Sequence, residues 1–209
     1  YCLQNYPTDV LKAPKSGEFS QTGIYLENVG LTQTPGTSPV YYDIKIGDYF
    51  GPPSPTIFDN LLFGIDALES NIICYQSVFQ NTNYVFSSKK YFGGIGINSI
   101  SNKDARRLML TPPAPFNTLR KNKFYDCHHA INGWNIFECD IRNIDLRSTQ
   151  GAIAKFNRGK FGIIMSSNRF KNYNINSNTF YNISNSINFN ALYGAFASFS
   201  NGQYAGTVN

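Results

Sequence analysis

Two adjacent histidines, His128 and His129, form the centre of the densest group of chemically reactive residue types in the chain. Around them lie carboxylates, a thiol and an indole: Asp126, Cys127, Trp134, Glu138 and Asp140. Imidazole transfers protons near neutral pH and is a common metal ligand. Neighbouring residues in an extended strand point to opposite faces, so we expect the two imidazoles not to share a metal ion. We predict no metal site and treat His128, His129 and Trp134 as binding residues.

A second chemically suggestive segment runs from Arg142 to Arg147, in the order Arg-Asn-Ile-Asp-Leu-Arg. Apolar and charged residues alternate on both sides of Asn143, which predicts two half-buried strands joined by a tight polar corner. The inward residues are expected to be Cys139, Ile141, Ile144 and Leu146. The outward residues are expected to be Asp140, Arg142, Asp145 and Arg147.

The elements that position these residues belong to a repeat. Four copies begin at a phenylalanine, with Asn or Asp two residues later, a usually small residue six later and a large apolar residue seven later. The copies are Phe58, Asn60, Gly64 and Ile65; Phe79, Asn81, Val85 and Phe86; Phe124, Asp126, Ala130 and Ile131; and Phe180, Asn182, Ser186 and Ile187. The longest match pairs Asn122–Ile131 with Asn178–Ile187. Self-similarity of this kind indicates a repeat architecture.

The spacing of the copies points to a β-solenoid. Successive phenylalanines are 21, 45 and 56 residues apart, so we expect coils of about 21 residues, with two coils and insertions in each wider interval. The fixed positions are Phe and Ile rather than a leucine ladder, and no long stretch has helical periodicity. A parallel β-helix is therefore predicted, with three short strands per coil and coils about 4.8 Å apart.

The Asn or Asp two residues after each phenylalanine suits a corner between strands. Short polar side chains tolerate the left-handed backbone region and bond to nearby backbone groups. We expect Asn60, Asn81, Asp126 and Asn182 to lie at corners and to stack on one another, and we interpret them as structural.

The motif Asn122-x-Phe124-x-x-Cys127-x-x-Ala130-Ile131 resembles the coil of right-handed parallel β-helix proteins of the pectin-lyase-like superfamily, especially Asn-rich secreted bacterial members. The resemblance covers roughly residues 55–190. It implies a fold, but the superfamily contains pectinolytic enzymes, phage tailspikes, adhesins and passive surface proteins. Pectate lyases use calcium-binding acids and an arginine base in a motif Arg-x-Pro-x-x-Arg, and Arg142 and Arg147 have this spacing with Ile144 in place of proline. Arg142, Arg147 and His128 are therefore the alternative catalytic set.

Composition and charge argue against a membrane-spanning protein and against a nucleic-acid-binding one. The chain has 209 residues with 42% hydrophobic content, and no apolar run approaches the length of a membrane span. Residues 103–171 carry 13 of the 18 Lys and Arg, but they are mixed with acids as on an ordinary solvated face, so nucleic acid is an unlikely partner. Residues 172–209 have no charge, and we expect further coils or a partner to cover them.

The four cysteines, Cys2, Cys74, Cys127 and Cys139, lack metal-type spacing, and their disulfide state is left open. Cys127 falls at a core position of the repeat and is expected to be buried as a small hydrophobe.

We expect an all-β chain with an irregular N-terminal cap over residues 1–55 and β-helix coils over 56–209, interrupted by a loop at about 87–121. The chain is expected to be part of a longer one. The favoured function is a noncatalytic, secreted or cell-surface, adhesin-like scaffold that contacts glycans or neighbouring proteins without a cofactor. The first alternative is a polysaccharide lyase or glycoside hydrolase, with calcium in the lyase case. The second is a phage tailspike-like fragment.

Overall fold

The computed structural model describes residues 20–32, 40–47, 54–82, 84–87, 90–101, 106–111, 121–149, 161–167, 172–191 and 197–200. Strands and irregular segments make up this part of the chain, which contains no helix, as the sequence predicts. Accordingly, no helix in these ranges is long and apolar enough to cross a membrane. Predictions about Cys2 and about residues 201–209 lie outside the described residues.

Most strands belong to three parallel sheets. Sheet A contains β1 (Ser20–Glu27), β6 (Leu61–Leu68), β11 (Ile95–Ile100), β14 (His129–Trp134), β17 (Phe161–Ser167) and β20 (Asn185–Ala191). Sheet B contains β4 (Ile44–Ile46), β7 (Ile72–Cys74), β12 (Arg107–Met109), β15 (Glu138–Arg142), β18 (Asn172–Asn176) and β21 (Ala197–Ser200). Sheet C contains β5 (Thr56–Asp59), β8 (Ser77–Gln80), β13 (Lys123–Tyr125), β16 (Asp145–Arg147) and β19 (Thr179–Tyr181).

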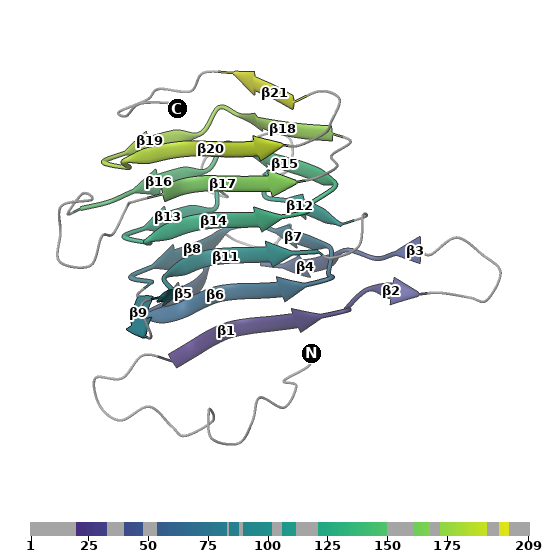
Figure 1. The fold of residues 1–209 in the computed structure, drawn as a ribbon, viewed down its shortest axis with the longest axis horizontal. Coiled ribbons are helices and arrows are strands. Elements are labelled where there is room, and N and C mark those ends of the chain that lie inside the picture. Colours follow the sequence, from purple (N-terminus) through teal and green to yellow (C-terminus); the bar gives the residue numbers. More distant parts are fainter. Residues whose placement is uncertain are drawn as a thin grey trace.

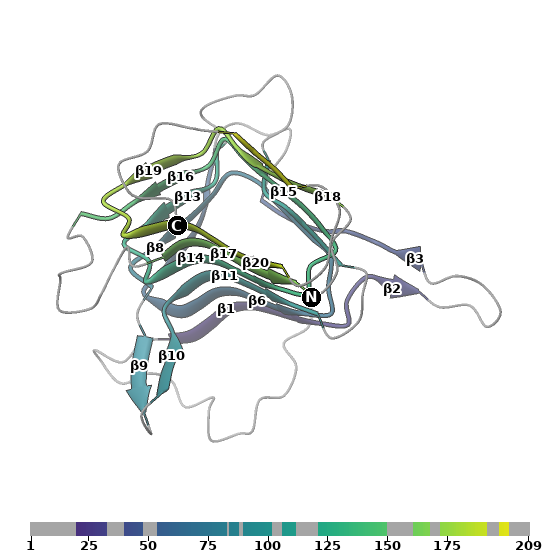
Figure 2. The same cartoon turned by 45° about the horizontal axis from the view of Figure 1, so that its top comes forward.

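Successive strands enter these sheets in rotation. After β6, β7 and β8 have joined sheets A, B and C, β11, β12 and β13 join them in the same order. We call one such passage a coil. The strands of each sheet stack in chain order (Figure 1), and the three sheets face a common interior (Figure 2). The described chain is thus an all-β stack of three parallel sheets, an arrangement compatible with a β-helix solenoid.

The repeated phenylalanines form one column in sheet C. Phe58 pairs with Phe79, and Phe79 with Phe124. Their ring centroids lie 4.7 and 4.8 Å apart, with planes 3° and 8° from parallel. Leu146 then separates Phe124 from Phe180. The interval between residues 79 and 124 is therefore one coil with insertions, and the expectation of two coils there is wrong, whereas residues 124 to 180 span two.

The apolar position after the small residue forms a second column, in sheet A. Its members are Ile24, Ile65, Ile97, Ile131, Ile163 and Ile187. Phe86 was expected in the place that Ile97 occupies, and this prediction is wrong. Phe86 lies in β9 (Tyr84–Ser87), which pairs with β10 (Lys90–Gly93) in an antiparallel hairpin inserted before β11. The insertion shifts the sequence offset without shifting the strand register.

The small residue is required both by the phenylalanine of the same coil and by the backbone carbonyl of the next coil, which would lie 2.5 Å from a Cβ on Gly64 and 2.7 Å from one on Gly96. A Cβ on Gly64 would come within 2.5 Å of Cδ1 of Phe79, and one on Gly96 within 2.8 Å of Cδ1 of Phe124. Either approach is shorter than ordinary van der Waals contact. Gly96 also takes the place expected for Val85, which belongs to the inserted hairpin.

The predicted corner residues adopt the left-handed conformation. Their φ angles are 59° at Asn60 and 53° at Asn81, Asp126 and Asn182, which confirms the expectation from short polar side chains. Asp126 accepts hydrogen bonds from the backbone N–H and the hydroxyl of Thr149, both at 2.8 Å. The side chain of Asp126 therefore accepts hydrogen bonds from the corner of the next coil, and the donor there, Thr149, is not a member of the predicted Asn and Asp stack.

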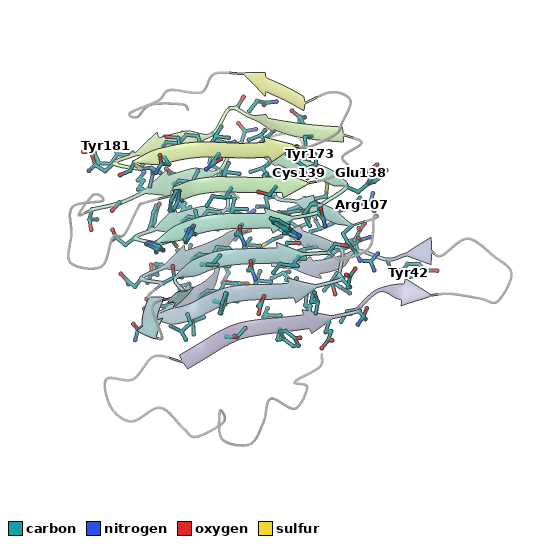
Figure 3. All side chains as sticks on the ribbon, in the orientation of Figure 1. Tyr42, Arg107, Glu138, Cys139, Tyr173 and Tyr181 are labelled. Atoms are coloured by element: carbon teal, nitrogen blue, oxygen red, sulfur yellow. The ribbon has the colours of Figure 1, made fainter. Side chains whose placement is uncertain are left out.

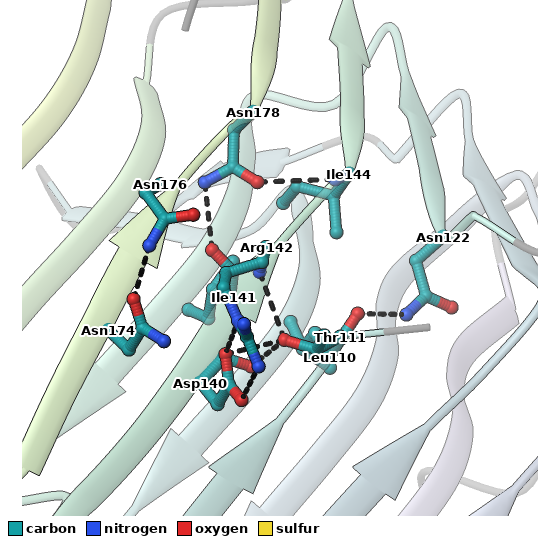
Figure 4. Close-up of polar contacts among 10 residues, drawn as sticks. All are labelled: Leu110, Thr111, Asn122, Asp140, Ile141, Arg142, Ile144, Asn174, Asn176 and Asn178. Carbon is teal, nitrogen blue, oxygen red and sulfur yellow. Dashed lines mark hydrogen bonds and ion pairs between the residues drawn. The ribbon is translucent and has the colours of Figure 1, made fainter. Parts of the chain in front are cut away.

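Asn122 and Asn178, which begin the longest repeat match, hold a different corner (Figure 4). The Asn178 Nδ2 donates to the Ile141 carbonyl at 2.9 Å, and its Oδ1 accepts from the Ile144 N–H at 3.2 Å. Asn122 makes the equivalent pair two coils earlier, donating to the Cys74 carbonyl at 2.7 Å and accepting from the Ser77 N–H at 3.0 Å. Both amides are buried and bridge the turn of the preceding coil.

The predicted strands around Asn143 are confirmed as β15 and β16, with a φ of 55° at the corner. The four residues expected to face inward are fully buried. Asp145, expected outside, is only 8% exposed. The side chain of Arg147 bonds its carboxylate and covers it.

Two segment predictions need correction. The range 87–121 is not a single loop, because β10, β11 and β12 lie within it and the last two belong to sheets A and B. Residues 1–55 are not only an irregular cap, because β1 and β4 supply strands to the same two sheets. Another short hairpin, β2 (Leu31–Thr32) with β3 (Val40–Tyr41), lies between them.

Candidate binding face

The outer surface of sheet C carries aromatic and cationic side chains in register on consecutive coils. Tyr125 pairs with Arg147, and Arg147 with Tyr181. Tyr181 is 54% exposed and the Arg147 side chain 55%, while Tyr125 is half-buried. Strand alternation buries the residue before each of them and so turns these three outward. We call Tyr125, Arg147 and Tyr181 the Tyr–Arg–Tyr row.

Arg147 is held in place within this row. Its Nε donates to both carboxylate oxygens of Asp145, at 2.8 and 3.0 Å. This hydrogen bonding raises the pKa of Arg147. Burial raises the pKa of the Tyr125 hydroxyl, and the nearby Asp145 carboxylate adds to the rise while Arg147 opposes it. The row therefore presents an ion-paired guanidinium between two phenol rings.

The structure brings His128 and His129 together, contrary to the expectation that they point apart. Their Nδ1 atoms are 2.9 Å apart. Residue 128 precedes β14 and lies in a bend, so strand alternation does not govern its direction. His128 is 3% exposed and His129 is half-buried, so His128 offers little surface to a large ligand.

Trp134 lies apart from the two histidines. It is the last residue of β14, whereas His129 is the first. The indole is 49% exposed. Trp134 is therefore separated from the two histidines by the length of β14, and the three residues predicted to bind a ligand do not form one site.

Arg142 is engaged by an acid on its own strand (Figure 4). Its Nε and Nη2 donate to the two carboxylate oxygens of Asp140 at 2.6 and 2.7 Å, and Thr111 Oγ1 donates to the same carboxylate at 2.6 Å. The bonds to Asp140 raise the pKa of Arg142. A general base needs its pKa lowered toward the working pH, so this shift has the opposite direction.

The alternative catalytic set does not converge. Arg142 ends β15 in sheet B and Arg147 ends β16 in sheet C, whereas His128 lies before β14 of sheet A. Each arginine pairs with the aspartate two residues before it. No group of three or more His, Cys, Asp or Glu side chains gathers as a metal site within the described ranges.

A buried ion pair, which the sequence did not indicate, lies between sheets A and B. Arg106 Nη2 lies 3.3 Å from Glu69 Oε2, with side-chain exposures of 1% and 6%. Ser101 Oγ donates to the same Glu69 oxygen at 3.0 Å. No sequence spacing links these residues, because inserted segments separate them along the chain.

The described cysteines, Cys74, Cys127 and Cys139, are buried and form no disulfide. Cys127 is 4% exposed within the apolar core, as predicted. Burial raises the pKa of the Cys74 thiol to about 12 and that of Cys139 well above its usual value. Such thiols are poor nucleophiles and poor metal ligands.

Comparison with known proteins adds no relative: no family model, no curated protein and no solved structure matches this chain. The Tyr–Arg–Tyr row was missed as a unit because the coil containing Leu146 lacks the repeated phenylalanine. The signal was nevertheless present at Tyr125 and Tyr181, each of which follows a repeat phenylalanine in a strand.

Proposed function

We propose that this chain is a right-handed parallel β-helix of the pectin-lyase-like type that acts as a noncatalytic, secreted or cell-surface scaffold. In this proposal its ligand is a glycan, bound on the outer face of sheet C. The rotation of strands through three parallel sheets supports the solenoid part of the proposal. The Tyr–Arg–Tyr row supports the binding part.

The observation that carries the proposal is the register of Tyr125, Arg147 and Tyr181 on three neighbouring strands. Strands in a sheet are about 4.8 Å apart, so the two rings are separated by roughly 10 Å with the guanidinium between them. Aromatic faces stack on the apolar faces of sugar rings, and arginine donates hydrogen bonds to hydroxyl or carboxylate oxygens. Because the row stands on strands, it is preorganised and little conformational entropy is lost on binding.

The same geometry gives no specific support to the enzyme alternative. A lyase needs a base and charge-stabilising groups within reach of one sugar ring. Here Arg142, Arg147 and His128 come from different sheets, and both arginines are ion-paired.

The test is incubation with a panel of neutral and acidic polysaccharides, with and without calcium, measuring binding and product release together. We expect binding without turnover, lost in Tyr181→Ala and weakened in Arg147→Ala. Tyr42→Ala is the matched control, because Tyr42 is 59% exposed and lies on the opposite side of the view in Figure 3. Product release that disappears in Arg147→Ala would instead establish a lyase, and equal binding by the Tyr181 and Tyr42 variants would remove sheet C as the binding face.

A further inference from the structure

The side chains of His128 and His129 bring two imidazole nitrogens into direct contact. Their Nδ1 atoms lie 2.9 Å apart, and their rings have centroids 4.4 Å apart and planes at 83°. This contact takes no part in the proposed glycan site, which lies on sheet C.

Neighbouring strands hold both imidazoles in this arrangement. The His129 ring stacks on Phe161 of β17, with centroids 4.7 Å apart and planes 8° from parallel. The His128 ring meets the same Phe161 edge-on at 6.2 Å. Backbone bonds fix the segment further, because the His129 N–H donates to the Gly94 carbonyl at 2.9 Å and the Phe161 N–H to the His128 carbonyl at 3.0 Å. The pair is therefore preorganised by the strands on both sides of β14.

The separation of the nitrogens suits one shared ion. Imidazole nitrogens bind first-row metals at about 2.0–2.1 Å, so two of them 2.9 Å apart subtend an angle of about 90° at the ion. That angle belongs to adjacent positions of a square-planar or octahedral site, which Cu²⁺ and Ni²⁺ favour, rather than to the tetrahedral site of structural zinc. We propose that His128 and His129 together bind a divalent copper or nickel ion through their Nδ1 atoms.

The proton balance of this site is simple. Without metal, one Nδ1 carries a proton and donates it to the other, because two protonated nitrogens would repel at this distance. A metal ion takes the place of that shared proton, which moves through solvent to the unprotonated Nε2 of the donor ring, so both imidazoles stay neutral with Nε2 protonated and no net proton is released. Water completes the coordination, since no third His, Cys, Asp or Glu converges there among the described residues.

The chain offers a clean test because it contains only these two histidines. The protein is made without a histidine tag and in a Cys2→Ser background, which leaves only the three buried thiols. Cu²⁺ is titrated in and followed by electron paramagnetic resonance, with Ni²⁺ titrated in parallel by calorimetry. We expect one equivalent of Cu²⁺ with hyperfine coupling to two imidazole nitrogens.

Two variants separate chelation from simple packing. His129→Phe keeps an aromatic ring to stack on Phe161, and His128→Asn keeps a small polar side chain; each is expected to lose the two-nitrogen signal and the Ni²⁺ heat. His129→Gln serves if the phenylalanine variant fails to fold by circular dichroism. Metal binding unchanged in the variants, or a wild-type spectrum without nitrogen coupling, would show that the pair is only a hydrogen-bonded contact and would overturn the proposal.

Discussion

Ala130 and Leu146 replace, within one coil, the glycine and phenylalanine found at the same two positions in the neighbouring coils. In the coil before, a Cβ on Gly96 would lie 2.8 Å from the Phe124 ring; in the coil after, one on Gly162 would lie 2.9 Å from the Phe180 ring. Where the ring is shortened to leucine, the methyl group of alanine fits, and both Ala130 and Leu146 are buried. The two positions therefore share one volume.

This relationship predicts an energetic coupling. Gly96→Ala should lower the free energy of unfolding by about 1–3 kcal/mol, because the added Cβ would lie 2.7 Å from the Ala130 carbonyl oxygen and 2.8 Å from Cδ1 of Phe124 and so overpacks the core. Gly96 lies outside the left-handed region, so backbone strain does not contribute. In the Phe124→Leu background the same substitution should cost less, because the contact with the ring is relieved while the contact with the Ala130 carbonyl remains; urea unfolding of the four proteins in a double-mutant cycle would show this. Additive effects would mean that the two positions do not compete for space.

The amide bridges predict a large cost for losing one buried asparagine. Asn178→Ala removes the partners of the Ile141 carbonyl and the Ile144 N–H, which both lie in the interior. We expect a loss of roughly 2–4 kcal/mol in the free energy of unfolding, since a buried unsatisfied group costs about 1–3 kcal/mol. Asn176→Ala, a half-buried asparagine on the outer side of sheet B, should change it by less than about 0.5 kcal/mol. Similar values for the two variants would refute the bridging role.

Replacing Asp66 with asparagine should raise the stability of the protein in a pH-dependent way. Burial raises the pKa of its carboxyl, so the folded state binds this proton more readily than the unfolded state and the charge at neutral pH is destabilising. Asp66→Asn keeps an oxygen to accept the 2.8 Å bond from Asn98 Nδ2. The Tm at pH 7 should rise, and the gain should vanish below the ordinary aspartate pKa of about 3.9, where both states carry the proton. Asp59→Asn, at an exposed acid, controls for the change in net charge; a gain that persists at pH 3 would exclude this explanation.

The buried thiols should react slowly with thiol reagents. Because burial raises the pKa of Cys74 to about 12 and also that of Cys139, neither forms an appreciable thiolate at pH 8. In the Cys2→Ser protein, a thiol reagent should label none of the three remaining cysteines until denaturant is added, and then label all three. Labelling that precedes the loss of circular dichroism would show that the core opens locally.

Much of the architecture could be predicted from the sequence. The strands of sheet C were predictable because every coil must fill the same core position, so a large apolar residue recurs in the sequence. The recurring residues are Phe58, Phe79, Phe124 and Phe180. The left-handed corners at Asn60, Asn81, Asp126 and Asn182 were equally predictable, because few side chains tolerate that backbone conformation. Strand alternation around Asn143 correctly separated the buried residues from Arg142 and Arg147.

Tertiary structure alone decided how many coils each interval holds. An insertion at a corner costs little loop-closure entropy, so chain distance between Phe79 and Phe124 does not report the number of coils. Hence Ile97 takes the place expected for Phe86. Leu146 lies in the phenylalanine column although the repeat pattern did not predict it there. Side-chain partners on different coils depend on which strands stack, and local sequence carries no signal for this. Examples are Glu69 with Arg106, Tyr125 beside Arg147, and His129 stacked on Phe161.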